Sequence, residues 1–448
     1  MDEVELGLIH PESMRGLHAE VARLKRERAR LRGTVSFQLG LHLTTAIRRP
    51  WRFPLLPITF PMLCLRLGLQ KIGRAPHPPL AGLSSTSVTS RRRSVVLFPT
   101  NGVGFGHFTR MYALARRLRE QDPEMEIVMF TSMPTLHVPY ADDFVTYHLA
   151  GRKKHGDLSA SAWNGLLEDM LRVVLDLHKP AVFVFDGAFP YRGMLNAIQG
   201  EEHLCKLWMK RGMFRAGARV PVDSTESFDS LIYPGDAVVE QSTSLQSDVE
   251  EVWVDPMLVY EPSELLERST ARRRLGLPSS ARVVYVQLGA GRINDIHSEI
   301  RVVVDALLSN SDIHVVLGES MLGERLEVNL ERVQILRDYP NMLMFNAIDY
   351  SIQAGGYNSF HEMRSLQIPT LFLPNMETGM DDQKARCDVA VNEGWGLVNV
   401  DRSARALASD VERLLSLPPG SGPISDTLNG ARQVASIVQE KVTAHVEL

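Results

Sequence analysis

The sequence has few cysteines and no recognisable export signal. Its three cysteines, Cys64, Cys205 and Cys387, are scattered through 448 residues without the spacing of a metal site. A disulfide framework is therefore not expected, which fits a reducing compartment such as the cytosol. The amino terminus, from Met1 to Pro11, is acidic and has no apolar core. We therefore expect no secretory signal and a cytoplasmic protein.

Acidic residues are missing between Arg28 and Arg119. Residues 1–93 hold sixteen Lys and Arg against six Asp and Glu, so they carry about +10 within a whole-chain net charge of -4. A basic segment this free of carboxylates suits an anionic partner. Because apolar residues interleave with its arginines, we expect that partner to be the inner face of the cell membrane, and we expect no nucleic acid.

The segment of residues 37–72 contains most of these interleaved residues. Pro54, Pro57 and Pro61 interrupt it, and the apolar stretch between Arg52 and Arg66 is shorter than a membrane span. We expect it to be too short and too broken to cross a bilayer, and to lie in the membrane interface with its aromatic residues at the headgroup level. The alternative is a helical hairpin packed on the body of the protein. A highly charged helix, a possible dimerisation element, is expected at Leu17–Leu31.

From Ser94 onward, short apolar runs alternate with segments of helical periodicity, which predicts βαβ units and parallel sheets. The chain is too long for one ordinary core, so two α/β domains are expected, at residues 94–258 and 259–448, after a basic helical extension and linker at 1–93. The expected strands of the first domain are Val95–Phe98, Glu126–Phe130, Ala181–Phe185, Cys205–Met209 and Ala237–Glu240. Those of the second are Val283–Leu288, Ile313–Leu317, Val333–Leu336, Met342–Phe345, Asp349–Gln353 and Thr370–Leu373. The region Leu407–Val446 is expected to form two helices.

A first glycine-rich loop, with Gly102, Gly104 and Gly106, follows the strand that ends at Phe98. A helix is expected to begin near His107. Glycines let a backbone approach a ligand closely, and unpaired N–H groups at a helix start favour phosphate. The spacing lacks the third glycine of a dinucleotide fingerprint, and no ribose-binding acid ends the second strand, so a nicotinamide site is not expected.

Three polar residues near this loop are candidates for chemistry. An unperturbed imidazole titrates near neutrality, as a general base should, so His107 is a candidate base, and the alternative is a structural histidine that caps the loop. Asp186, at the end of the strand Ala181–Phe185, is a second candidate base, with a loop cap as the alternative. Arg110 is placed to hold an acceptor phosphate or to be solvated.

The second domain contains further loops of this type. Its first strand leads into Gly289-Ala290-Gly291-Arg292, another junction suited to phosphate. Gly355 and Gly356 precede a helix whose first turns carry candidate donor-binding side chains: Asn358, Ser359 and Glu362. A carboxylate such as that of Glu362 suits the vicinal hydroxyls of a ribose, although an exposed helical glutamate is the alternative. After Pro374, Asp382 and Gln383 open another helix and offer polar groups to a sugar.

This ordered set of motifs resembles the GT-B glycosyltransferases. It is most similar to the family of the transferase that adds N-acetylglucosamine to form lipid II, whose relatives act in polysaccharide and glycolipid synthesis. The resemblance covers about residues 94–440 and is strongest in the two glycine loops and in Gly355–Gln383. It implies a GT-B fold, in which two Rossmann-like domains face each other across a cleft and the final helix crosses back onto the first domain.

The resemblance also implies an activity. The expected reaction moves a hexose, with GlcNAc as the candidate, from a UDP-sugar to a lipid-linked or membrane-associated acceptor of cell-envelope synthesis, with inversion. In that family the first glycine loop and its histidine face the acceptor diphosphate, and the ribose-binding glutamate falls on Glu362. The pair that reads the sugar hydroxyls falls on Asp382 and Gln383. The loops that contact the donor diphosphate fall on Gly289–Arg292 and Gly356–Ser359.

Two departures limit what the resemblance implies. Val103 and Phe105 stand where the lipid II enzyme has smaller or polar residues, so the acceptor is inferred only as a class. No Asp-x-Asp triplet occurs in the chain, which argues against the transferases that hold Mg²⁺ or Mn²⁺ through such carboxylates. No metal or other cofactor is expected, and helix starts and basic side chains, with Arg292 as the candidate, would stabilise the leaving diphosphate.

Three other functions fit the same motifs. The first is a transferase that acts on a small soluble acceptor such as a natural product. The second is a UDP-sugar 2-epimerase of the same fold, although the extra carboxylates which that chemistry needs around the sugar are not apparent. The third is a donor-binding scaffold that has lost catalysis and recruits a partner enzyme.

Overall fold

The computed structural model describes residues 34–71, 92–100, 105–199, 201, 203–210, 225–238, 249–289, 296–320, 325–326, 328–378, 381–420 and 429–446. The chain divides into two compact units, Met1–Thr89 and Ser90–Leu448, each of which is considered by itself. The charged helix expected at Leu17–Leu31 lies outside the described residues.

The amino-terminal unit contains a helical hairpin. Helix α2 (Val35–Arg48) is followed by the 3₁₀ helix η1 (Pro50–Leu55) and by α3 (Leu56–Lys71). Thr34 caps α2 by accepting a hydrogen bond from the N–H of Phe37. The two long helices are joined by a 3.0 Å hydrogen bond between the His42 ring and the Thr59 hydroxyl.

The prolines of this segment do not interrupt it as expected. Pro54 lies inside η1, and Pro57 lies in the first turn of α3, where an N–H group needs no helical partner. Only Pro61 lies deeper in α3, and the helix continues past it. The run Pro50–Leu69, 20 residues with a mean hydropathy of 1.2, is long and apolar enough to cross a membrane by length and composition alone.

The second unit holds two fully parallel sheets. The first has seven strands in the order β3-β2-β1-β4-β5-β6-β7. Their bounds are β1 (Arg92–Pro99), β2 (Glu126–Thr131), β3 (Val145–His148), β4 (Pro180–Asp186), β5 (Cys205–Met209), β6 (Ser230–Pro234) and β7 (Glu250–Val254). The second has six strands in the order β10-β9-β8-β11-β12-β13. Their bounds are β8 (Arg282–Gln287), β9 (Ile313–Gly318), β10 (Val333–Leu336), β11 (Tyr350–Gln353), β12 (Thr370–Phe372) and β13 (Gly396–Val398).

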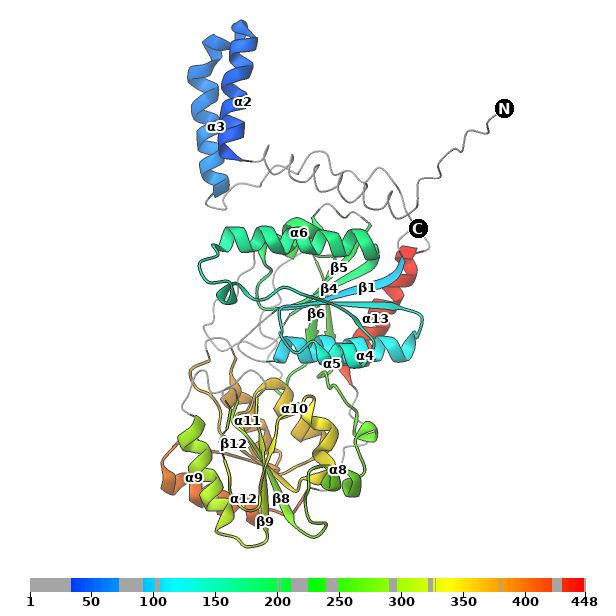
Figure 1. Cartoon of the computed structure of the whole chain (residues 1–448), viewed down its shortest axis with the longest axis vertical. Coiled ribbons are helices and arrows are strands. Elements are labelled where there is room, and N and C mark those ends of the chain that lie inside the picture. Colours follow the sequence, from blue (N-terminus) through cyan, green and yellow to red (C-terminus); the bar gives the residue numbers. More distant parts are fainter. Residues whose placement is uncertain are drawn as a thin grey trace, which may run out of the picture. The chain divides into compact units, whose positions relative to one another are not determined.

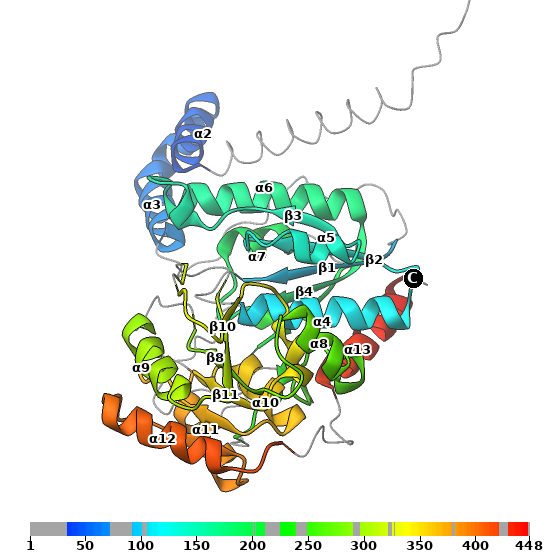
Figure 2. The ribbon, with the colours of Figure 1, turned by 60° about the horizontal axis from the view of Figure 1, so that its bottom comes forward.

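Helices cover both faces of each sheet (Figures 1 and 2). On the first sheet, α4 (Gly106–Gln121) and α13 (Gly430–Val446) lie on one face, and α6 (Ala160–His178) and α7 (Arg192–Ile198) on the other. On the second sheet, α9 (Ile296–Leu308) and α12 (Ala404–Ser416) lie opposite α10 (Tyr357–Leu366). The remaining helices are α5 (His137–Ala141), α8 (Arg268–Arg274), α11 (Gln383–Asn392), η2 (Arg152–Lys154), η3 (Thr225–Ser227), η4 (Pro262–Glu264) and η5 (Asn341–Ala347). Burial on both faces explains why the central strands are continuous apolar runs.

The strand orders fix where ligands can bind. In each sheet the order reverses beside the first strand, between β1 and β4 and between β8 and β11. The last paired residues there are Pro99 with Asp186 and Gln287 with Gln353. Open parallel sheets bind ligands outside the carboxyl ends of strands at such reversals. The glycine loops predicted from the sequence follow strands at these two points: the first follows β1, and the loops at Gly289 and at Gly355 follow β8 and β11.

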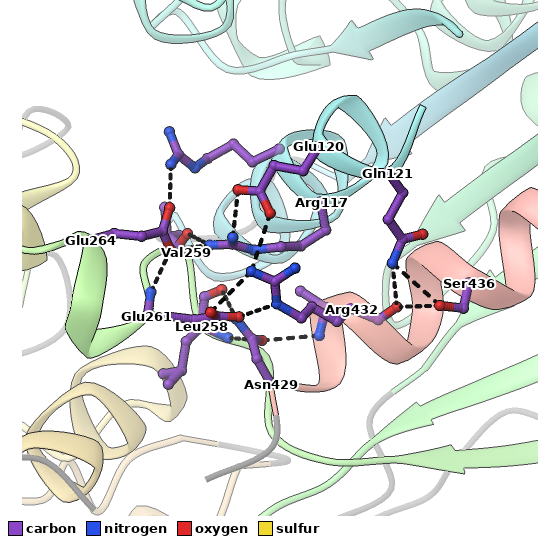
Figure 3. Close-up of polar contacts among 12 residues, drawn as sticks. Arg117, Glu120, Gln121, Leu258, Val259, Glu261, Glu264, Asn429, Arg432 and Ser436 are labelled. Atoms are coloured by element: carbon purple, nitrogen blue, oxygen red, sulfur yellow. Dashed lines mark hydrogen bonds and ion pairs between the residues drawn. The ribbon is translucent and has the colours of Figure 1, made fainter. Parts of the chain in front are cut away.

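The carboxyl-terminal helix returns to the first domain, as predicted. α13 packs against α4, β1 and β4. Just before it, the Asn429 amide exchanges two 3.0 Å hydrogen bonds with the backbone of Leu258 in the connection between the domains (Figure 3). The buried Arg117 of α4 donates to the Val259 carbonyl in the same connection. The crossing is tight, because a Cβ on Gly430 would lie 1.8 Å from the Asp255 carbonyl oxygen.

Several predicted strands were wrong or missed. Met342–Phe345 is not a strand but part of η5, because a short apolar run has no period that separates a buried turn from a strand. Ala237 and Val238 are not in a strand, and the rest of Ala237–Glu240 lies outside the described residues. The strands β3, β6, β7 and β13 were missed, since they are only three to five residues long. β3, β6 and β7 also include polar or charged residues.

Candidate active site

His107, Arg110 and Asp186 form one contact cluster at the reversal of the first sheet. His107 and Arg110 lie in the first turns of α4, and Asp186 is the last residue of β4. His107 Nδ1 lies 2.7 Å from Asp186 Oδ1. Arg110 holds the same carboxylate with both ends of its fork, at 2.9 Å through Nε and 2.8 Å through Nη2. The two sequence candidates for the base are therefore in contact. Arg110, which was predicted to bind acceptor phosphate or to be solvated, is buried against Asp186.

The cluster determines which nitrogen of His107 carries the proton. An ionised carboxylate only accepts hydrogen bonds, so the contact with Asp186 requires a proton on Nδ1. Arg110 Nη2 also lies 2.9 Å from Nδ1, but a guanidinium has only donors, so this second contact is not a hydrogen bond in that tautomer. Nε2 then carries the lone pair of the neutral ring, as a general base requires.

Asp186 is held ionised although it is almost fully buried. Burial by itself would raise the pKa of a carboxyl group, but the charge of Arg110 and the hydrogen bond from His107 outweigh it and hold the pKa of Asp186 below its usual value. A buried carboxylate that orients an imidazole also stabilises the imidazolium that forms when the ring takes a proton. The arrangement is that of a base and its orienting acid.

The second glycine loop opens α10 at the reversal of the second sheet. Gly356 is the N-cap residue of α10, and no side chain caps the free N–H groups there. Gly355 has φ +80°, and a Cβ on it would lie 2.4 Å from the Cys387 sulfur, so the position requires glycine. Among the described residues, Ser359 Oγ has no hydrogen-bond partner, and the Asn358 side-chain oxygen is buried without one. A helix start with uncommitted N–H and hydroxyl groups suits a phosphate group.

Glu362 lies in the second turn of α10, and no hydrogen bond or ion pair among the described residues involves its carboxylate. Burial raises its pKa to about 7. The Glu362 carboxylate is close enough to the phenols of Tyr285 and Tyr339 for its charge to contribute to raising their pKa values. A partly buried carboxylate without a protein partner is suited to accept hydrogen bonds from a ligand's hydroxyls.

Asp382 and Gln383 have structural contacts. Asp382 is the N-cap of α11 and accepts a 3.0 Å hydrogen bond from the N–H of Ala385. The Gln383 side-chain oxygen accepts from the N–H of Asn375 at 2.9 Å, which ties together the two ends of the loop that joins β12 to α11. Both side chains are only partly buried, so a role toward a sugar stays a prediction.

Of the remaining site candidates, the structure describes two, and four lie outside the described residues. Gly106 is the first residue of α4, and a Cβ added to it would have no described atom within 4 Å outside its own helix backbone and chain neighbours. Gly289 has φ +97° and follows the end of β8. Gly102, Gly104, Gly291 and Arg292 lie outside the described residues. Within the part of the chain that the structure describes, no group of three or more His, Cys, Asp or Glu residues is arranged to hold a metal ion.

Sequence reasoning missed a second buried cluster, which joins the two domains. Arg386 of α11 makes bidentate contacts with Asp236, from the first domain, at 2.8 and 2.7 Å. It also donates to Asp381 at 2.7 Å and to the Gly355 carbonyl at 3.1 Å. Asp236 follows the carboxyl end of β6, and recognising that strand would have drawn attention to it.

Comparisons with known proteins agree with this architecture. No protein-family model matches the chain. An uncharacterized glycosyltransferase of Methanopyrus kandleri is 31% identical over 131 residues, which make up 28% of this chain and 36% of that protein. The match therefore spans about a third of the relative's length.

Solved structures extend the likeness over most of the chain. The glycotransferase of kitacinnamycin and the spinosyn forosaminyltransferase each have a TM-score of 0.51 and 14% identity, covering 79% of this chain and 95% of theirs. The UDP-GlcNAc 2-epimerase of Methanocaldococcus jannaschii, solved with UDP-GlcNAc and UDP, also has a TM-score of 0.51, with 12% identity, covering 78% of this chain and 99% of its own. The chain has the GT-B fold, with two parallel-sheet α/β domains. Because an epimerase shares it, the function has to be argued from the site.

Proposed function

We propose that this protein is a glycosyltransferase that moves a hexose, with GlcNAc as the candidate, from a UDP-sugar to a membrane-associated or lipid-linked acceptor. The observation that carries the proposal is the 2.7 Å contact between His107 and the buried Asp186 at the strand reversal of the first sheet. The partial sequence match to a glycosyltransferase and the shared GT-B fold support it. The resemblance to the lipid II family supports UDP, GlcNAc and a lipid acceptor.

In the proposed reaction, His107 Nε2 takes the proton of an acceptor hydroxyl while the oxygen attacks the anomeric carbon of the donor sugar. The bond between that carbon and the diphosphate oxygen breaks, and UDP leaves with the electron pair. Attack from the opposite face inverts the anomeric centre. Asp186 stabilises the imidazolium, and the start of α10 stabilises the charge that develops on UDP. No metal ion takes part in these steps.

The amino-terminal hairpin supports a membrane-associated acceptor. Its apolar side chains are mostly exposed, and residues 34–71 contain no Asp or Glu. The exposed apolar residues are Val35, Phe37, Leu41, Leu43, Ile47, Trp51, Phe53, Leu55, Ile58, Met62 and Leu65. Three arginines, Arg48, Arg49 and Arg52, gather around the turn between α2 and η1. Apolar side chains beside uncompensated arginines suit an anionic lipid surface. This supports our proposal that the enzyme works at the cytoplasmic face of the membrane.

The donor site is tested by thermal unfolding in the presence of UDP, GDP, dTDP and their common sugar conjugates. A ligand that binds only the native state raises its melting temperature. We expect a shift with UDP compounds that is lost in Glu362→Ala and kept in Glu412→Ala, which changes an exposed glutamate on α12. No shift with any nucleotide would contradict both the transferase assignment and the proposed donor site.

The membrane contact is tested by flotation with vesicles that contain an anionic phospholipid. Ile47→Glu and Ile58→Glu change exposed positions, so they leave the fold intact while placing a charge in the proposed lipid contact. We expect both to reduce flotation, and Val400→Glu, an exposed position in the second domain, to leave it unchanged. Equal flotation of all four proteins would remove the hairpin as the membrane contact and favour a soluble acceptor.

A further inference from the structure

A tyrosine at the start of the donor helix makes contacts in the other domain. Tyr357 is the first residue of α10, directly after Gly355-Gly356, and its side chain is buried. Its hydroxyl donates to the Gly235 carbonyl of the first domain at 2.9 Å and accepts from the N–H of Met257, in the connection between the domains, at 3.2 Å. The helix that begins the proposed diphosphate site is thus anchored in the acceptor domain.

Two guanidinium groups lie over the ring of Tyr357. The Cζ atom of Arg110 is 5.4 Å from the ring centroid, and that of Arg386 is 5.9 Å from it. Both are within the range of a cation–π interaction, which is strongest where water is excluded. Arg110 belongs to the cluster that orients His107, whereas Arg386 holds the Gly355 carbonyl. A continuous series of contacts therefore runs from the proposed base, through Tyr357, to the donor loop.

Asp236 completes this series from the acceptor domain. It binds the Arg386 fork bidentately, and the His361 ring lies 3.3 Å from its Oδ1. Burial opposes its ionisation, but the charge of Arg386 outweighs this and holds the pKa of Asp236 far below its usual value. Burial lowers the pKa of His361, which keeps that ring neutral near pH 7. Asp236 is therefore a permanent negative charge that fixes Arg386.

We infer that Asp236 is a positioning residue for the nucleotide donor, although it lies in the acceptor domain. Through Arg386 it fixes the Gly355 carbonyl, and with it the peptide units that start α10. Tyr357, the first residue of α10, also contacts Arg110, which helps to orient His107. The donor loop thus takes its binding geometry only when the two domains are joined by these contacts. This inference rests on the proposed function, because it assigns α10 to the donor diphosphate.

The test is the Kd of UDP, measured by calorimetry on the full-length protein well below its melting temperature. Asp236→Asn keeps the shape of the side chain and removes its charge. We expect its Kd to rise roughly tenfold or more, as for the loss of a charged hydrogen-bonding partner. Arg364→Ala is the matched control, because it breaks the ion pair between Arg364, near the end of α10, and Glu393, the C-cap residue of α11, without reaching the loop. Its Kd should equal that of the unchanged protein.

A second variant covers the case in which Asp236→Asn does not fold. Tyr357→Phe keeps the ring over both arginines and removes the hydroxyl that binds Gly235 and Met257, and we expect a Kd roughly threefold or more above the unchanged protein. A merely structural role would lower the melting temperature of the unliganded variants and leave the Kd of the folded protein unaltered, which would overturn the inference. If the unchanged protein binds neither UDP, GDP nor dTDP, the proposed function itself fails.

Discussion

The starts of α4 and α10 are alike in sequence and fold but differ in how their polar side chains are used. Each follows a glycine loop at the strand reversal of a parallel sheet. At the start of α4, His107 and Arg110 contact each other and Asp186. At the start of α10, Ser359 and Glu362 have no side-chain partner among the described residues. A base has to be oriented before the substrate arrives, whereas ligand-binding groups keep their hydrogen bonds for the ligand.

The comparison predicts its largest effect at His107. His107→Ala removes the proposed base, so turnover should fall by roughly 10²- to 10⁴-fold. The Kd of UDP should not change, because the donor groups lie on α10. Steady-state turnover and calorimetry on the same preparation measure the two quantities.

Two further variants serve as controls for His107→Ala. Asp186→Asn keeps the side-chain shape and should also lose turnover, because an amide can present its N–H to the ring and favour the wrong tautomer. His203→Ala, at an exposed position before β5, should keep full turnover. Equal turnover of His107→Ala and the unchanged protein would show that His107 is a structural cap of the loop.

A smaller effect is expected at Glu362, on the donor side. Glu362→Gln keeps the size of the side chain but removes the charge that would accept hydrogen bonds from ribose. The loss of charge-assisted hydrogen bonds should weaken UDP binding roughly 10- to 100-fold. Glu412→Gln, on the exposed face of α12, should bind UDP as the unchanged protein does. If Glu362→Gln binds UDP equally well, the carboxylate faces something other than the nucleotide.

The smallest effect is a pH dependence that follows from the pKa of about 7 for Glu362. Because burial raises this pKa above that of the unfolded chain, ionisation of Glu362 opposes folding, and the stability of the unliganded protein should fall as pH rises through about 7. Relative to Glu362→Gln, we expect a loss on the order of 1–3 kcal/mol between pH 5 and 8. Denaturant unfolding of both proteins across this range measures it.

Binding of UDP should have the opposite dependence. Ribose hydroxyls that donate to the ionised carboxylate favour that form, so UDP affinity should rise as pH increases toward 7 and level off above it. Glu362→Gln corrects for the titration of the UDP phosphates themselves. Parallel pH profiles of the two proteins would mean that Glu362 does not contact the donor.

Sequence reasoning could predict both candidate sites because glycine loops after apolar strands mark the carboxyl edge of a parallel sheet. It named His107, Asp186 and Glu362 as individual candidates from their positions after strands and within helix starts. It did not predict that Asp186 and His107 are in contact, because the 79-residue separation is closed only by the pairing of β1 with β4. It also missed Asp236 and Arg386, which are 150 residues apart and meet across the domain boundary.

Errors in the fold have a different physical origin. Short strands such as β6 and β13 are set by pairing with neighbours and not by their own composition, so local patterns do not reveal them. The apolar residues of η5 are buried in the core that α10 covers. In the sequence they form a short apolar run, which has the same pattern as a buried strand. The segment was predicted to be too broken by prolines to cross a bilayer. A proline is tolerated in the first turn of a helix, and the sequence alone did not show where each helix begins.

The most direct test of the central claim is sugar transfer itself. The full-length protein is mixed with a UDP-hexose, UDP-GlcNAc first, labelled in the sugar, and with a total lipid extract, and label is followed into the lipid phase. We predict incorporation by the unchanged protein and by His203→Ala, and none by His107→Ala. Conversion of the donor to an epimer without transfer, or incorporation that does not depend on His107, would contradict the account.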